Sequence, residues 1–315
     1  MSTNSSGIVC IGAATLDAVV SVPRPLPVDG RLVIEAGVLS GGGPAATAAV
    51  TLARQGVPTA FLGRVGSDVA GSFIREGLAA EGVDVSGLRA VGGAGSAFSA
   101  VLVDPTEAER LILVYPGSCP PWEPSGADLD LCRAAQWVHV DQTGWPVIRH
   151  LRSEGIQTPV SVDGGNPIPD LDLSLVALYA PAEPALRAAS GADDIEAGMA
   201  WALNRGAQLV VVTRGAQGSV AMARFDLEAP FAPSLLSTRS GQAVRVVAET
   251  AHPAPMVSTL GAGDVFHGAL LAYLGRGHSV RVAMRIANVA AALSCAGLDG
   301  RSAIPRRQQL DAYLD

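Results

Sequence analysis

Short apolar runs and longer amphipathic stretches follow one another along most of the chain. Residues 8–12 are an apolar run that ends in glycine, the pattern of a buried strand that opens a sheet. Residues 44–55 and 70–81 are predicted helices, the first with a proline in its first turn and a glycine just past its end. Further strands are predicted at residues 59–63, 137–140, 159–162, 175–179 and 209–213. Because helical stretches separate the later strands, the pattern predicts an α/β fold with a mostly parallel sheet and helices on both faces.

Four early segments lie outside this alternation. Residues 18–22 and 32–39 are rich in β-branched side chains and are separated by a stretch of proline and glycine. Residues 96–103 and 110–115 are predicted to form a hairpin around a polar tip. We expect these four strands to form a small second sheet.

The composition suits one large folded unit. Hydrophobic side chains make up 49% and charged side chains 16% of the 315 residues, so the chain can bury a large core. No internal repeat, low-complexity tract or linker interrupts the pattern. We therefore expect a single domain, residues 1–315, with a lid whose strands come from about residues 18–39 and 97–115.

Charge and cysteine content argue against several classes of protein. The formal net charge is −7 and the basic residues form no cluster, whereas a nucleic-acid partner needs a concentrated basic surface. The four cysteines are scattered without Cys-x-x-Cys spacing, which argues against a disulfide framework or a zinc site. No apolar run reaches the roughly 18 residues of a membrane span, and the N-terminus lacks a signal-peptide pattern. We expect a cytoplasmic protein with no nucleic-acid or membrane partner.

The segment with the clearest chemistry is a turn of small residues that runs into an apolar helix. Gly261, Ala262 and Gly263 let a ligand approach the backbone and leave N–H groups of the first helical turn unpaired. These N–H groups and the positive end of the helix dipole form an anion site. Asp264 follows directly, and a carboxylate beside an anion site can accept the proton of a hydroxyl that attacks phosphorus. The alternative is that Asp264 is only a helix-capping acid.

Two motifs resemble the signatures of one enzyme family. Residues 258–264, Ser-Thr-Leu-Gly-Ala-Gly-Asp, are similar to the C-terminal signature D-T-x-G-A-G-D of the ribokinase/PfkB carbohydrate kinases. Residues 41–50, Gly-Gly-Gly-Pro-Ala-Ala-Thr-Ala-Ala-Val, resemble the N-terminal signature, and residues 211–218 resemble the nucleotide-binding strand and loop. The resemblance covers nearly the whole chain in the same order. It implies a three-layer α/β/α ribokinase-like domain with a mostly parallel sheet and a small β-sheet lid.

The resemblance also implies a function and a set of site residues. It implies transfer of the γ-phosphoryl group of ATP to a sugar hydroxyl, with Asp264 as general base and Mg²⁺ arriving on the ATP phosphates. The transferring group would be held by Gly261, Ala262 and Gly263. The expected substrate-binding residues are Asp17, Arg31, Gly41, Gly42 and Gly43, and the expected nucleotide-binding residues are Thr213, Gly215, Gly218 and Asn288. A second subunit commonly covers the apolar face of such a lid, so we expect a homodimer through the lid.

Three positions depart from the family pattern. Ser258 replaces the first Asp of the C-terminal signature, which leaves a monovalent cation site open. Ala46 stands where ribokinase-like members usually have an Asn that contacts the sugar. Residues 182–185, Ala-Glu-Pro-Ala, take the place of an N-x-x-E motif that helps to order magnesium-bound water. Glu183 is therefore either a shifted magnesium residue or a surface acid.

The sequence predicts the type of reaction more precisely than the identity of the acceptor. The motifs look closest to the sulfofructose kinases, which phosphorylate a ketose sulfonate at its primary hydroxyl. Residues 141–145 lack the Arg expected beside a sulfonate, and Val114 stands where that branch has Asn, although Arg31 could supply a charge from the lid. A ketohexose or a sulfofructose-like ketose is the expected acceptor, with a nucleoside kinase of the same fold and a non-catalytic sugar or nucleotide sensor as alternatives. His267 is interpreted as a packed or hydrogen-bonded helix residue.

Overall fold

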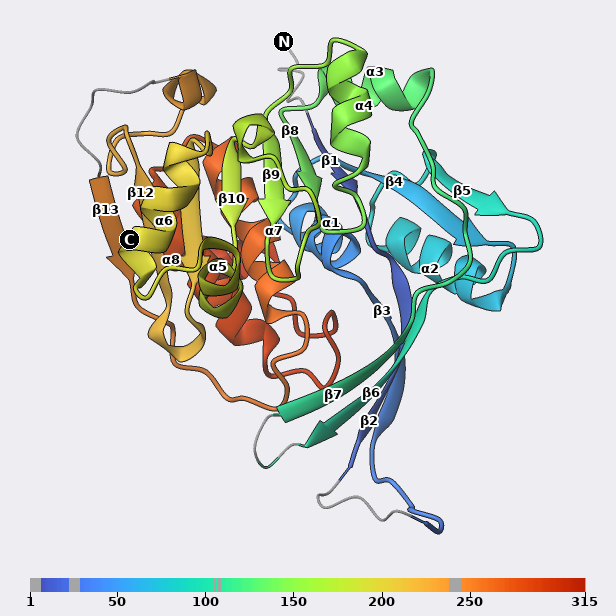
Figure 1. The fold of residues 1–315 in the computed structure, drawn as a ribbon. Helices are drawn as coiled ribbons and strands as arrows, with labels where there is room; N and C mark the ends of the chain where they lie inside the picture. Colours follow the sequence, from blue (N-terminus) through green and yellow to red (C-terminus); the bar gives the residue numbers. More distant parts are fainter. Residues whose placement is uncertain (1–6, 23–28, 105, 107–108, 238–244, 315) are drawn as a thin grey trace.

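The main sheet follows the predicted alternation. The structure is a computed structural model that describes residues 7–22, 29–104, 106, 109–237 and 245–314. Within these residues, nine strands form one sheet in the order β13-β12-β11-β10-β9-β8-β1-β4-β5 (Figure 1). All neighbours from β11 to β5 are parallel, and β12 and β13 add antiparallel at one edge. The strands are β1 (Ile8–Ile11), β4 (Thr59–Gly66), β5 (Leu88–Val91), β8 (Trp137–Val140), β9 (Val160–Asp163), β10 (Leu178–Ala180), β11 (Leu209–Thr213), β12 (Ser219–Ala223) and β13 (Arg245–Glu249). The prediction of a mostly parallel sheet is confirmed.

Helices cover both faces of this sheet. Consecutive strand residues point to opposite faces, so Cys10 packs in one buried cluster and Val9 in the other. The cluster around Cys10 also contains residues of α1, α7 and α8, and the cluster around Val9 contains residues of α4 and α6. The helices are α1 (Pro44–Arg54), α2 (Val69–Ala80), α3 (Ala127–Ala134), α4 (Val147–Ser153), α5 (Glu183–Ser190), α6 (Ile195–Asn204), α7 (Ala262–Gly275), α8 (Val280–Ser294) and α9 (Arg307–Asp311). This arrangement confirms the predicted α/β/α layers.

Several strands of the main sheet differ from the sequence-based expectation. The strands β5, β12 and β13 were not predicted, and β12 is buried on both faces and lacks the alternation that marks a strand. The strand expected at residues 175–179 covers only Leu178–Ala180. A short 3₁₀ helix, Leu173–Leu175, occupies the preceding residues, and the Asp172 side chain caps it by accepting from the Ser174 N–H at 3.0 Å.

The early strands form a separate four-stranded sheet, as predicted. Its order is β3-β2-β6-β7, and it extends beside the main layers (Figure 1). The strands β2 and β6 are parallel, whereas the two outer pairs are antiparallel. The strands are β2 (Thr15–Ser21), β3 (Gly37–Gly42), β6 (Phe98–Asp104) and β7 (Glu109–Tyr115). We call this sheet the lid.

The lid strand expected at residues 32–39 begins later, at Gly37, and ends at Gly42. Its partner β2 ends at Ser21, and the paired register with β3 reaches only from Thr15 to Val20. Residues before Gly37 therefore have little strand to pair with. Part of the lid segment expected at 18–39, residues 23–28, lies outside the described residues. No described helix is long and apolar enough to cross a membrane.

Candidate active site

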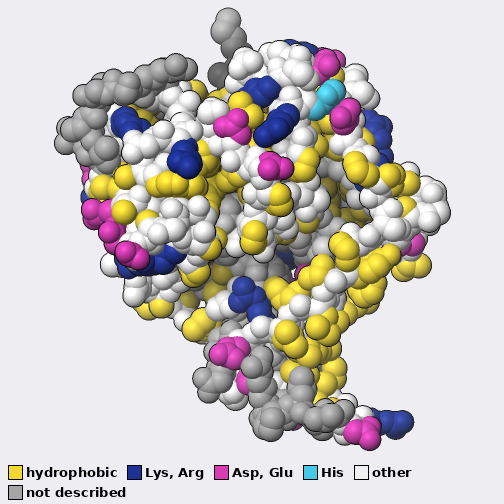
Figure 2. All heavy atoms as spheres, in the orientation of Figure 1, with side chains coloured by type: hydrophobic (Ala, Val, Ile, Leu, Met, Phe, Trp, Pro, Cys, Tyr) yellow, Lys and Arg dark blue, Asp and Glu magenta, His cyan; other side chains and the backbone are white. Residues whose placement is uncertain are grey.

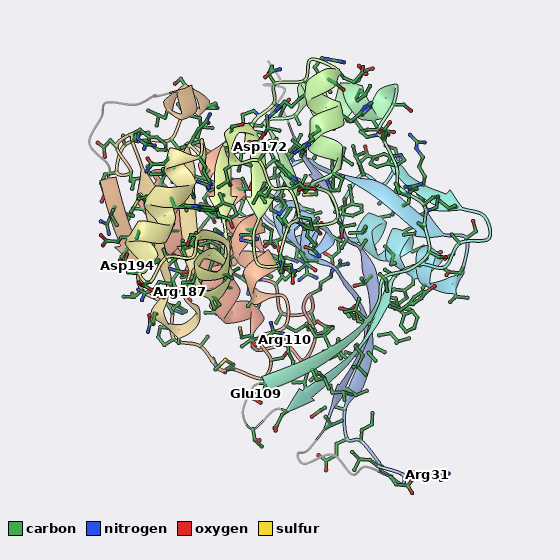
Figure 3. All side chains as sticks on the ribbon, viewed as in Figure 1. Arg31, Glu109, Arg110, Asp172, Arg187 and Asp194 are labelled. Atoms are coloured by element: carbon green, nitrogen blue, oxygen red, sulfur yellow. The ribbon has the colours of Figure 1, made fainter. Side chains whose placement is uncertain are left out.

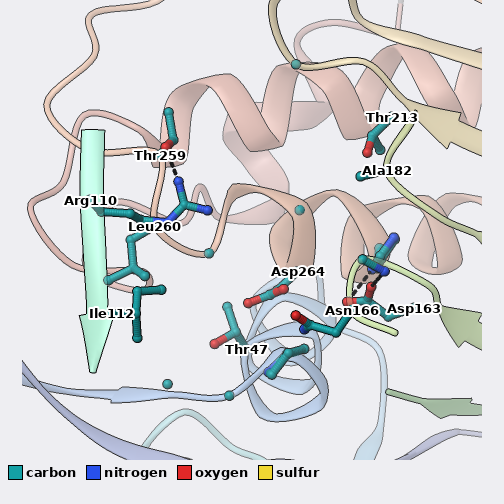
Figure 4. A pocket seen from close by; sticks show the side chains of 18 of the residues that line it. Thr47, Arg110, Ile112, Asp163, Asn166, Ala182, Thr213, Thr259, Leu260 and Asp264 are labelled. Carbon is teal, nitrogen blue, oxygen red and sulfur yellow. Dashed lines mark hydrogen bonds and ion pairs between the residues drawn. The ribbon is translucent and has the colours of Figure 1, made fainter. Parts of the chain in front are cut away.

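A cavity of about 1120 Å³ lies between the main sheet and the lid. Asp163 and Thr213 line it from the carboxyl ends of β9 and β11, and Ser99 and Ile112 line it from the lid strands β6 and β7. The N-terminus of α7 closes a further side, where Asp264 points into the cavity toward Thr47 (Figure 4). Open parallel sheets bind their ligands at the carboxyl ends of the strands. This cavity is therefore the candidate active site.

The turn before α7 presents free backbone donors to the cavity. Gly261 is the N-cap of α7 with φ of 74°, a left-handed conformation that favours glycine. The N–H groups of Gly261, Gly263 and Asp264 have no hydrogen-bond acceptor among the described residues, whereas the Ala262 N–H donates to the Thr259 carbonyl at 3.3 Å. Gly261 and Gly263 line the cavity and Ala262 does not. The turn thus has the geometry of an anion site formed by the two glycines and the helix N-terminus.

Asp264 is half-buried on the first turn of α7, among other acids. Burial, and next the nearby charge of Asp163, raise the pKa of Asp264 to about 8, while His267 acts in the opposite direction. A carboxyl group with a pKa near neutrality suits acceptance of a proton. The N-cap residue of α7 is Gly261, which has no side chain to cap the helix, and Asp264 lies three residues further on in the first turn.

His267 and Asp163 are site residues that the sequence did not single out for catalysis. Both line the cavity, and Nδ1 of His267 lies 2.9 Å from Oδ2 of Asp163. His267 is indeed packed on α7, as interpreted from the sequence, but it also carries a charge partner. No sequence spacing connects the two residues, because they meet only when β9 and α7 pack side by side.

Asp17 lies on β2 at the lid end of the cavity and is buried. Its carboxylate accepts a hydrogen bond from the Thr15 hydroxyl at 2.7 Å. Burial raises the pKa of Asp17, and its hydrogen bonds with Thr15 and Ser99 partly oppose the shift. Gly42 lies so close that a Cβ there would be 2.0 Å from Oδ2 of Asp17, so the close approach requires glycine.

The other residues expected to bind the acceptor fall into two groups. Gly42 and Gly43 line the cavity at the end of β3. Gly41 does not line it and packs against Arg301, whose Nη1 would be 2.1 Å from an added Cβ. Arg31 is exposed at the far tip of the lid, well away from the cavity (Figure 3).

Some of the residues expected to bind the nucleotide line the cavity and others do not. Thr213 and Gly215 line the end of the cavity opposite to the lid. Gly218, with φ of 84°, and Asn288 do not line it. The Asn288 amide donates to the Ser219 hydroxyl at 3.1 Å and to the Thr250 carbonyl at 3.2 Å. Asn288 therefore joins α8 to β12 and to the segment after β13.

Glu183 lines the same end of the cavity between two arginines. Its Oε1 lies 2.8 Å from Nη2 of Arg187, and its Oε2 lies 2.9 Å from Nε of Arg214. Hydrogen bonds from Arg214 and then Arg187 hold the pKa of Glu183 below its usual range. Both carboxylate oxygens thus face guanidinium groups in this arrangement.

Arg110 is a further cavity residue that sequence reasoning missed. Residues 110, 112 and 114 of β7 all line the cavity, because alternate residues of a strand share a face. The Arg110 guanidinium donates to the Thr259 hydroxyl at 2.5 Å, two residues before Gly261 (Figure 4). The lid thus places a positive charge beside the glycine turn. The period of two along β7 was the signal that could have identified it.

Comparison with known proteins gives the family. Residues 5–307 match the family described as pfkB family carbohydrate kinase. The chain is 27% identical to a ribokinase of Arabidopsis thaliana, over 95% of this chain and 77% of that protein. It is 31% identical to a fructokinase of Klebsiella pneumoniae, over 87% of this chain and 91% of that protein. The solved structure of Arabidopsis thaliana ribokinase complexed with ribose and ATP superposes with a TM-score of 0.79 at 25% identity, covering 98% of this chain and 99% of that one.

The chain therefore belongs to the PfkB family of carbohydrate kinases. It is a phosphotransferase of the sugar and nucleoside kinase class, with the ribokinase-like fold. Kinases of this family use ATP and Mg²⁺.

Proposed function

We propose that this kinase transfers the γ-phosphoryl group of ATP to a hydroxyl of a small ketose, with Asp264 as general base. One observation carries the proposal: Asp264 points into the cavity beside backbone N–H groups that have no acceptor among the described residues. A carboxylate there can take the hydroxyl proton while the N–H groups hold the phosphoryl oxygens. We further propose that the main sheet and the lid act together as one kinase domain.

Each residue has a defined part in this mechanism. Asp264 accepts the proton as the hydroxyl oxygen attacks the γ-phosphorus, and the bond from phosphorus to the ADP oxygen breaks. The N–H groups of Gly261 and Gly263 donate to the phosphoryl oxygens as their negative charge grows. Asp17 accepts hydrogen bonds from other hydroxyls of the acceptor and fixes its orientation.

Thr213 and Gly215 suit the nucleotide because they line the end of the cavity that lies away from the lid. No group of three or more His, Cys, Asp or Glu side chains that could hold a metal ion occurs in the described part of the chain. Magnesium would therefore enter on the ATP phosphates, whose charge it neutralises. The single carboxylate of Glu183 is the candidate contact at this end, provided that it leaves its arginine partners.

Arg110 supports an acceptor that carries an anionic group. The guanidinium lies on the cavity face of the lid, near the turn where the acceptor hydroxyl must react. Asp17 and Asp264 make the rest of this end acidic, so a cation from the lid would balance a negatively charged substituent. A sulfonated ketose fits this description, and a neutral ketohexose fits the same pocket with weaker binding.

A screen of ADP release tests the acceptor class. The panel pairs a ketohexose with its 6-sulfonated and 6-phosphorylated analogues and adds aldoses and nucleosides. We expect turnover with ketoses and a higher kcat/KM for the anionic members. Turnover with nucleosides alone would show that the acceptor is a nucleoside and not a ketose. ATP binding without turnover on any acceptor would favour a non-catalytic sensor.

The lid supports a homodimer as well as catalysis. Its face away from the cavity exposes large apolar side chains, which are between 42% and 59% accessible: Leu39, Phe98, Leu111, Leu113 and Tyr115. Figure 2 shows hydrophobic side chains gathered over the lid strands. A second copy of the chain would cover this face through the same patch, as in a symmetric dimer.

Leu113→Glu should convert the dimer to a monomer, because a charge buried in an apolar interface is costly. Size-exclusion chromatography with light scattering measures the change. Met256→Glu, which alters an exposed apolar side chain outside the lid, is the matched control and should stay dimeric. A monomeric wild-type protein at micromolar concentration would contradict the dimer.

A further inference from the structure

Asp163 and His267 form a buried ion pair that the proposed phosphoryl transfer does not itself use. Oδ2 of Asp163 lies 2.9 Å from Nδ1 of His267, and the two side chains are only 6% and 5% exposed. Asp163 is the last residue of β9, and His267 lies on α7. The Gly165 N–H donates to the other oxygen of Asp163 at 2.8 Å, so this carboxylate is held from two sides.

The pair lies directly beside the proposed base. His267 follows Asp264 by three residues on α7, a spacing that places two side chains on the same side of a helix. All three side chains line the cavity. Two carboxylates in one site repel each other unless a cation balances one of them.

We propose that the Asp163–His267 pair is a positioning pair that keeps Asp264 ionisable, with His267 as an imidazolium that cancels the charge of Asp163. The inference rests on the proposed base role of Asp264. His267 transfers no proton in this proposal. The histidine acts only through the charge that it contributes and the orientation that it gives to Asp163.

The electrostatics of the three groups agree with this geometry. Burial lowers the pKa of His267, but the Asp163 carboxylate, with smaller contributions from Asp264 and the Ala180 carbonyl, raises it above its usual value. Burial raises the pKa of Asp163, but His267, with smaller contributions from the Gly165 N–H and His139, lowers it below its usual range. Both shifts favour the charged forms, an imidazolium beside a carboxylate. Without His267, the charge of Asp163 would act on Asp264 uncompensated.

Among the described residues, His267 is the cation that forms an ion pair with Asp163, whereas Arg110 donates to the Thr259 hydroxyl and Arg301 to the Gly42 carbonyl. The ionisable groups around this site are His139 and Asp141 from β8 and its end, Tyr179 from β10, Arg110 from the lid and Arg301 from the segment after α8. Burial, and then His267, lower the pKa of His139 to about 3, so it is neutral. The Asp141 carboxylate accepts hydrogen bonds from backbone N–H groups, including those of Ala13 and Ala45, and its negative charge cannot balance that of Asp163.

The test compares the pH dependence of kcat/KM in three variants. In the wild type, kcat/KM should rise with pH and level off above about pH 8, where Asp264 is ionised. His267→Asn should move this rise upward by about one pH unit, so the loss is about tenfold at pH 7 and shrinks at higher pH. The double variant, which combines His267→Asn with Asp163→Asn, removes both charges. The pH at which its kcat/KM rises should therefore return toward the wild-type value.

His139→Asn is the matched control, because it removes a neutral histidine whose ring centroid lies 5.8 Å from that of His267. It should leave the pH profile in place. If the pair were only structural, His267→Asn and the double variant would each lower kcat/KM by a constant factor at every pH, and the double variant would be at least as impaired as His267→Asn. A profile that does not move in His267→Asn would overturn the proposal.

Histidine NMR supplies a measurement that needs no acceptor and no turnover. With labelled histidines, His267 should remain protonated above pH 6.5 in the wild type and become neutral at pH 6.5 in Asp163→Asn. A neutral His267 at pH 7 in the wild type refutes the pair as proposed, even if a variant fails to fold. Failure of the proposed function is separate: it would appear as full activity in Asp264→Asn.

Discussion

The two ends of the cavity each hold an acidic side chain, and these acids differ in their surroundings. Asp264, at the glycine turn, is half-buried and faces Asp163, and its pKa is raised to about 8. Glu183, at the end away from the lid, lies between Arg187 and Arg214, and its pKa is lowered. The carboxyl group of Asp264 thus suits the acceptance of a proton, whereas the surroundings of Glu183 favour its ionised form.

The difference follows from the neighbouring charges and from burial. Burial and a second carboxylate disfavour the ionised form, whereas two guanidinium groups favour it. An acid of the first kind suits general-base catalysis near neutral pH. An acid of the second kind suits an anchor that fixes arginines near the phosphates of a nucleotide. Three substitutions can break or sharpen this comparison.

The largest effect is expected for Asp264→Asn, which keeps the size of the side chain and removes its basicity. Turnover should fall by about 100- to 10,000-fold, the usual contribution of a general base. ATP affinity should change little, because the donors of the turn are backbone N–H groups. Kinetics and calorimetric ATP binding check the two statements. A folded variant that keeps more than a tenth of the wild-type turnover would show that Asp264 is not the base.

A smaller effect is expected for Arg110→Gln at the lid. The KM for an anionic ketose should rise by about tenfold to 100-fold, the value of a hydrogen bond to a charged group. The KM for the neutral ketohexose should change much less. Steady-state kinetics on the matched pair of acceptors measure this difference. Equal losses on both acceptors would mean that Arg110 serves the phosphoryl group or the lid itself.

The smallest effect is expected for Glu183→Gln, at the end of the cavity where we propose that the nucleotide binds. If Glu183 anchors Arg187 and Arg214, turnover at saturating magnesium should fall by less than about threefold, because ion pairs that are partly open to solvent contribute little. The concentration of Mg²⁺ that gives half-maximal activity should stay the same. A higher Mg²⁺ requirement in the variant would instead support the magnesium role that the sequence suggested for Glu183.

Much of the fold could be predicted because its signals are local. The buried strands appear as short apolar runs, and the helix after Gly261 begins at a turn whose small residues are consecutive in the chain. The glycine turn consists of consecutive residues, so its composition could be recognised from the sequence alone. The strand β12 could not, since its five residues, Ser219–Ala223, are all buried and show no polar alternation.

The sequence by itself determined the order of the layers, the glycine turn and the position of Asp264 on α7. Only the tertiary structure decided which charges surround that carboxylate. Asp163 comes from β9, His267 from α7 and Arg110 from the lid, and packing of separate elements brings them to one cavity. Charge interactions act through space over a few ångströms. The pKa of a site residue therefore depends on partners whose distance along the chain says nothing about their distance in the fold.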